Sequence, residues 1–117
     1  MRATLIVRVP VLKLEKFCQN DEEQRILDSY RRWSQAPQLT FLKKVSWLVG
    51  RSAVRVWVLA EPGVQFVAFV YEYPSSFNNR LLEAVRSDLA KRGADRIEDA
   101  REGTLMSEQV RDLCSEE

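Results

Sequence analysis

The side chains best suited to binding lie in two neighbouring stretches, residues 53–60 and 64–73, where aromatic groups recur among apolar ones. The candidate binding residues there are Arg55, Trp57, Phe69, Tyr71, Glu72 and Tyr73. Aromatic rings beside a basic group can stack nucleobases, line a ligand pocket or pack against a second protein chain. Only Ala68, Phe69 and Val70 fit the aromatic RNA-binding motif, so the pattern favours a packing or subunit interface over base stacking.

Glu72 is the one carboxylate among these aromatic residues. If the sheet buries Glu72, the pKa of its carboxyl would rise, which would make it a candidate general acid or base, or the counter-ion of a cationic ligand. The alternative is that the strand has left the sheet by Glu72, because Pro74 follows closely, and that water solvates the carboxylate. The sequence favours this alternative.

The chain has few side chains that are suited to catalysis or to metal binding. The chain has no histidine, which removes Ser–His and Cys–His nucleophile pairs and the usual non-thiol zinc ligand. Cys18 and Cys114 are too far apart for a Cys-x-x-Cys pair, and we expect two reduced thiols rather than one disulfide. No glycine-rich phosphate-binding motif is present. The sequence therefore predicts no catalytic residue, no metal and no cofactor, and it leans towards a protein that is not an enzyme.

The charges are unevenly distributed although the net charge is only +1. Residues 1–58 hold 11 basic and 5 acidic side chains, whereas residues 59–117 hold 7 basic and 12 acidic ones. The basic segment 31–57 contains no acid and is a candidate nucleic-acid-binding surface. The alternative, which we favour, is that the two halves fold against each other and neutralise their charges.

Two elements are predicted in the first third of the chain. Residues 3–14 are rich in Val, Ile and Leu and are typical of a strand. Pro10 cannot donate a backbone hydrogen bond, so this strand either lies at an edge of the sheet or ends near Pro10. Asn20 and Glu23 match a capping box, and an apolar stripe then predicts a helix that ends before Pro37. In residues 38–49 the apolar side chains recur at a helix-like interval of three, and some of them also alternate as in a strand. We expect a short helix or irregular start that passes into a strand near Val45.

The rest of the chain predicts a hairpin and a second helix. Residues 53–60 and 64–73 are strand-like, and Pro62-Gly63 between them is typical of a type II turn with a positive φ at Gly63. The second helix follows Ser75 or Ser76 and ends at Gly93. Its expected apolar stripe consists of Phe77, Leu81, Leu82, Val85 and Leu89. Residues 95–100 are either an edge strand or a loop, and residues 105–113 suggest a short helix.

This order predicts one α+β domain over residues 1–117, with a small antiparallel or mixed sheet, two main helices on one face, and a peripheral C-terminal segment 95–117. If residues 95–100 pair as a strand, the order becomes βαββαβ, which is ferredoxin-like. The N-terminus has no cleavage site and no apolar window spans a membrane, so we expect a cytoplasmic protein without a membrane partner.

Both faces of the predicted hairpin carry large apolar groups, so something must cover the face that the helices leave open. We expect Trp57, Phe69 and Tyr71 to share that open face and to form the interface of a homodimer. The leading hypothesis is a non-catalytic binding module that self-associates in this way. The alternatives are a small-molecule-binding domain or cofactor-independent enzyme with an aromatic-lined pocket that uses Glu72 or Arg55, and a nucleic-acid-binding protein.

Overall fold

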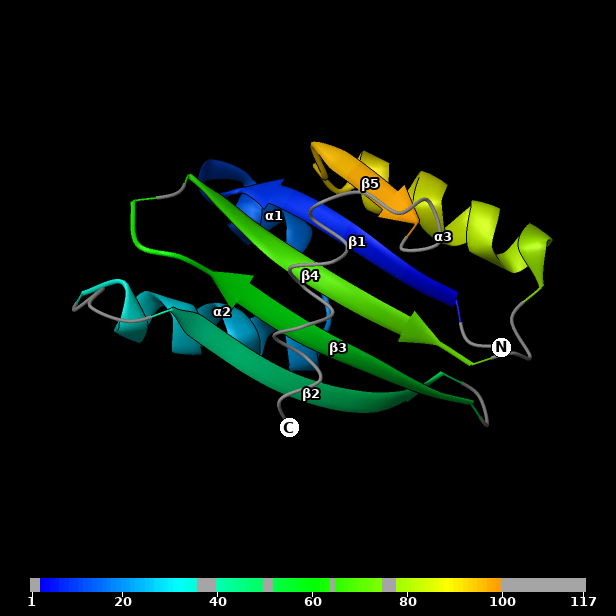
Figure 1. Ribbon diagram of the computed structural model, residues 1–117, viewed down its shortest axis with the longest axis horizontal. Helices are drawn as coiled ribbons and strands as arrows, with labels where there is room; N and C mark the ends of the chain where they lie inside the picture. The colour runs from blue at the N-terminus through cyan, green and yellow to red at the C-terminus, as the bar shows by residue number, and fades with distance from the viewer. Residues whose placement is uncertain (1–2, 36–39, 50–51, 64, 75–77, 100–117) are drawn as a thin grey trace.

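The computed structural model describes residues 3–35, 40–49, 52–63, 65–74 and 78–99. These residues form a five-stranded antiparallel sheet whose helices all lie on one face (Figure 1), which confirms the predicted α+β class. The elements in chain order are β1 (Ala3–Pro10), the short 3-10 helix η1 (Val11–Lys13), α1 (Leu14–Phe17), α2 (Asp21–Trp33), β2 (Phe41–Val49), β3 (Ser52–Ala60), β4 (Phe66–Tyr73), α3 (Asn79–Lys91) and β5 (Arg96–Asp99).

The strands lie in the order β2-β3-β4-β1-β5, so β1 sits between β4 and β5. Without β2, the elements β1, α2, β3, β4, α3 and β5 follow the βαββαβ order, and β2 extends that sheet at its outer edge. Phe41–Val49 is one continuous strand, so the helical or irregular start expected before Val45 is wrong over these residues. Pairing with β3 outweighs the helix-like spacing of the apolar side chains, because it gives the backbone N–H and C=O groups hydrogen-bond partners along the whole strand.

Two polar caps fix the starts of the main helices. The Asn20 side chain accepts a hydrogen bond from the Glu23 backbone at 2.7 Å, and the Glu23 side chain accepts one from the Asn20 backbone, which confirms the predicted capping box. α3 begins later than predicted because Asn78 caps it, accepting a hydrogen bond from the Leu81 backbone at 3.0 Å. Leu81 is half exposed rather than buried in the apolar stripe.

The turn between β3 and β4 has the predicted backbone, since Gly63 has a φ of +78°. Gly93 has a φ of +109° and ends α3 as expected. Several other expectations lie outside the described residues. They are the stop at Pro37, the caps at Ser75 and Ser76, Phe77 in the apolar stripe, the state of Cys114 and the C-terminal helix.

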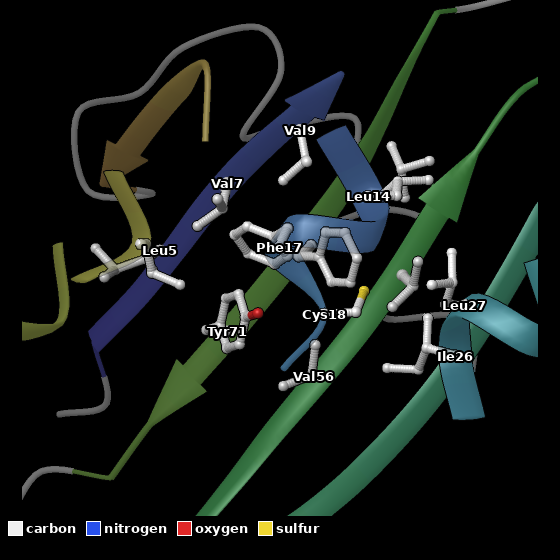
Figure 2. Close-up of a cluster of buried hydrophobic side chains, with 14 of the residues drawn as sticks. Leu5, Val7, Val9, Leu14, Phe17, Cys18, Ile26, Leu27, Val56 and Tyr71 are labelled. Carbon is white, nitrogen blue, oxygen red and sulfur yellow. The ribbon is translucent and has the colours of Figure 1, made fainter. Parts of the chain in front are cut away.

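The main core lies between the sheet and the helices. Figure 2 shows Phe17 and Cys18 over the sheet, close to Val7, Val56 and Tyr71. The Phe17 ring lies 4.9 Å from that of Phe69 between ring centroids. Cys18 is a free, buried thiol. This packing joins the turn after β1 to the middle of the sheet, so the central strands are held from one side.

Candidate functional site

The register of the sheet separates the six predicted site residues onto two faces. Trp57 lies opposite Val70, and Val58 lies opposite Phe69. Residues directly across an antiparallel pair share a face, so Trp57 shares its face with Val70 and not with Phe69. The predicted single face of Trp57, Phe69 and Tyr71 is therefore wrong.

Phe69, Tyr71 and Tyr73 point towards the helices and belong to the main core. Their rings follow one another along β4, with 6.3 Å between the centroids of Phe69 and Tyr71 and 6.0 Å between those of Tyr71 and Tyr73. The helices bury all three residues. They stabilise the domain from inside and offer no surface to a partner.

A buried charged network lies beside these tyrosines, and no local sequence pattern indicates it. The guanidinium of Arg92, at the end of α3, pairs with the Glu23 carboxylate and donates a hydrogen bond from Nε to the Phe17 carbonyl at 2.9 Å. The Tyr71 hydroxyl donates to Glu23 Oε2 at 3.2 Å. Burial, together with the charge of Glu23, raises the pKa of Tyr71 well above its usual value. The network ties both helices to the sheet.

We call the helix-free side of the sheet the open face. Its centre is an apolar cluster of Ile6, Trp57 and Val70, with Leu59 packed against them. Two other predicted site residues, Arg55 and Glu72, lie beside this cluster and form an ion pair at 3.8 Å. β4 continues through Tyr73, so the expectation that the strand leaves the sheet by Glu72 is wrong.

The open face is already shielded from solvent. Ile6 is 1% exposed, Val70 3% and Trp57 6%. Glu98 of β5, across from Ile6, is also buried and pairs with Arg96 at 2.7 Å. The open face thus has an apolar centre and a border of paired charges, and its central side chains do not face free water.

A separate open pocket of about 540 Å³ lies where β1 ends and β4 begins. Its walls are mostly apolar and contain none of the six predicted site residues. The residues that line it are Pro10, Val11, Leu12, Tyr30, Gln65 and Phe66. Leu12 is 98% exposed, so its whole side chain is accessible to a molecule that enters the pocket.

Packing fixes the aromatic walls of this pocket. The Val11 backbone donates a hydrogen bond to the Gln65 carbonyl at 3.0 Å, which joins the pocket's two chain segments. The Arg8 guanidinium lies over the Phe66 ring, 4.2 Å from its centroid. Tyr30 packs against Trp33 and Phe41, and partial burial raises the pKa of its hydroxyl. The sequence could not indicate this pocket, because Leu12 and Gln65 meet only through the sheet.

Several side chains of the basic segment 31–57 have partners within the chain. Arg31 pairs with Glu15, and Lys43 donates a hydrogen bond to the Ser29 hydroxyl at 2.6 Å. Arg55 pairs with Glu72, as described above. Of these three contacts, Arg55–Glu72 is the one that joins a base of the first half to an acid of the second half, as the expected neutralisation of the two halves requires.

Among the described residues, no group of three or more acidic, cysteine or histidine side chains could hold a metal ion. None of the helices in that part of the chain is long and apolar enough to cross a membrane. No protein-family model, no curated protein and no solved structure matches this chain.

Proposed function

We propose that this chain is a non-catalytic binding module and that its binding site is the pocket beside Leu12. The observation that supports this function is the fully exposed Leu12 next to an open pocket of about 540 Å³. Binding sites for small molecules have volumes of about 300–1,000 Å³ and mostly apolar walls with a few polar groups. The pocket fits this description, whereas the six residues predicted from sequence lie elsewhere.

The chemistry of the walls defines the class of ligand. Phe66 and Tyr30 offer ring surfaces, and Pro10 and Leu12 offer aliphatic ones. Tyr30 and Gln65 are the two lining residues with polar side-chain atoms. A small molecule with an aromatic or alicyclic ring and one hydrogen-bonding group matches these walls.

Fragment binding tests this function. Substituted phenols and anilines are titrated into isotope-labelled protein while amide resonances are followed by NMR. We expect the resonances of Leu12, Tyr30 and Phe66 to shift together and to saturate. Leu12→Ser should weaken binding by about tenfold, since a lost leucine contact is worth about 1–2 kcal/mol. Because Leu12 is exposed, its substitution should leave stability almost unchanged.

Leu81→Ser is the matched control. Leu81 is the other large exposed apolar residue of the described chain, and it lies on α3, away from the pocket. It should leave the fragment affinities unchanged. Shifts that scatter over the surface, or equal losses in both variants, would contradict the pocket as the binding site.

Self-association through the open face is the second candidate function. The cluster of Ile6, Trp57 and Val70 within a border of charged pairs favours it, because interfaces combine an apolar centre with a polar rim. A partner would have to reach side chains that are already shielded. Sedimentation at tens of micromolar distinguishes the two functions, since a wild type that stays monomeric contradicts self-association and leaves the pocket untouched.

A further inference from the structure

We infer that the pocket beside Leu12 selects its ligands by charge, that it favours small aromatic carboxylates, and that Arg8 sets this preference. The preference presupposes the proposed function, because it concerns the ligand of the same pocket. The Arg8 guanidinium carbon lies 4.2 Å from the centroid of the Phe66 ring. Phe66 is a wall of the pocket, so a positive charge stands directly behind that wall.

The walls of the pocket are themselves uncharged. The six lining residues have apolar or neutral polar side chains. Tyr30 is the one titratable residue among them, and its raised pKa keeps the hydroxyl protonated at neutral pH. The polar side-chain groups of Tyr30 and Gln65 can each donate or accept a hydrogen bond, so they favour neither sign of charge. A preference for one sign therefore comes from groups behind the walls.

Arg8 covers one face of the Phe66 ring. It is not one of the lining residues, so the pocket reaches the ring from its other face or from its edge. An aromatic ring has a negative face and a positive edge. The cation draws the electrons of the ring towards itself, which makes the far face less negative and the edge more positive. Either surface then favours a carboxylate over a cation.

The charge of Arg8 also acts on a ligand directly. A group stacked on the far face of Phe66 lies about 8 Å from the guanidinium, since each of the two contacts spans about 4 Å. A ring rather than water fills the space between them, so the two charges are only partly screened. A carboxylate gains this interaction and a cation of the same shape loses it, so the difference between the two ligands is twice the single interaction.

Asp95 holds Arg8 in place and offsets part of its charge. The Arg8 guanidinium donates a hydrogen bond to Asp95 Oδ2 at 3.0 Å, and the Asp95 backbone N–H donates one to the Arg8 carbonyl at 2.9 Å. Asp95 is therefore a positioning residue for the guanidinium. Its negative charge weakens the field of Arg8 in the pocket, so removal of that charge alone should strengthen the preference for an anion.

Three ligands of nearly the same shape test the preference. Benzoate, benzamide and the benzamidinium ion each join a phenyl ring to a small planar group, and at neutral pH they carry a negative charge, no charge and a positive charge. Each is titrated into the isotope-labelled chain, and its Kd is taken from the resonances of Leu12, Tyr30 and Phe66. We expect benzoate to bind most tightly and benzamidinium most weakly, with Kd values that differ by about fivefold.

Charge variants test the role of Arg8. Arg8→Met should lower the ratio of the benzamidinium Kd to the benzoate Kd to about one or below, and Asp95→Asn should raise it above that of the wild type. Arg80→Met is the matched control, because it removes the same charge from the protein. Arg80 lies in the first turn of α3, which follows the end of β4 that is far from the pocket (Figure 1). This control should leave the ratio unchanged.

The outcomes separate charge selection from the pocket itself. Equal affinities for benzoate and benzamidinium in the wild type, or a ratio that changes equally in Arg8→Met and Arg80→Met, would overturn the role of Arg8 and leave the pocket as a binding site. No saturable shift with any of the three ligands would contradict the pocket and this preference together. If Arg8→Met does not fold, the wild-type ratio and Asp95→Asn decide, and a ratio that fails to rise in Asp95→Asn overturns the inference.

Discussion

The buried thiol of Cys18 should make the stability of this protein depend on pH in the alkaline range. Burial, reinforced by the charge of Glu23, raises the pKa of Cys18 from 9.0 to about 12. The folded chain therefore holds this proton at a pH at which the unfolded chain releases it. The contribution of Cys18 to the free energy of unfolding is fully present below pH 9 and is lost between pH 9 and 12. The loss over the first pH unit is on the order of 1 kcal/mol. Urea unfolding of wild type and Cys18→Ala should show a flatter alkaline decline in the variant, and parallel declines would contradict the burial.

The pair of Glu23 and Arg92 should be worth more to the fold than any surface ion pair. Glu23 is 1% exposed, and its replacement leaves the Arg92 charge partly buried without this partner. We expect Glu23→Gln to lower the free energy of unfolding by about 3 kcal/mol in denaturant titrations. Adding Arg92→Met should restore part of this loss, because the unpaired charge is then removed.

The surface pair of Arg31 and Glu15 provides the matched comparison. Both side chains are at least half exposed. Glu15→Gln should cost less than about 1 kcal/mol, as is usual for exposed pairs. Similar losses for Glu15→Gln and Glu23→Gln would mean that burial does not strengthen the inner pair.

Among the elements, the hairpin of β3 and β4 depends on the backbone of one residue. Gly63 has a φ of +78°, and a Cβ built there would have no atom within 4 Å. Gly63→Ala should therefore lower the free energy of unfolding by about 1 kcal/mol, because alanine disfavours a positive φ and not because its Cβ would clash. A lowered denaturation midpoint with unchanged slope is the expected result. An unchanged midpoint would show that the turn tolerates a side chain.

The helices and the turn were predictable from sequence because each depends on neighbouring residues. The Asn20–Glu23 capping box and Pro62-Gly63 act over two to four positions. The pairing of β3 with β4 was harder, because the alternation within each strand leaves open which face of one strand joins which face of the next. Because of this ambiguity, the prediction wrongly placed Trp57 and Phe69 on the same face of the sheet.

The candidate site could not be predicted for a related reason. The pocket joins Leu12, Tyr30 and Phe66, which are far apart in sequence and meet only when the sheet forms. Likewise, Glu23 and Arg92 are separated by 69 positions and come together at two helix ends. Local sequence patterns do not indicate contacts between residues that are far apart in the sequence. Leu12 taken alone is only an apolar residue after a strand.

For the molecule as a whole, folding brings the opposite charges of the two halves together. Arg8 pairs with Asp95, Arg55 with Glu72, and Glu23 with Arg92. Each of these pairs joins a residue of the first half to one of the second. Arg8–Asp95 and Arg55–Glu72 each neutralise a base of the positive first half with an acid of the negative second half, whereas Glu23–Arg92 has the reverse signs, so two of the three pairs reduce the charge asymmetry.

The central position of β1 has a consequence for how the molecule is made. β1 is synthesised first, yet Val7 pairs with Phe69 and Ile97, which leave the ribosome 62 and 90 residues later. β2, β3 and β4 are neighbours in sequence and can pair as they emerge, whereas β1 depends on contacts of long sequence separation, which form slowly. The pairs of β1 with β4 and β5 therefore form after those of β2 with β3 and β3 with β4, and until then the apolar side chains of β1 lack their partners in the sheet.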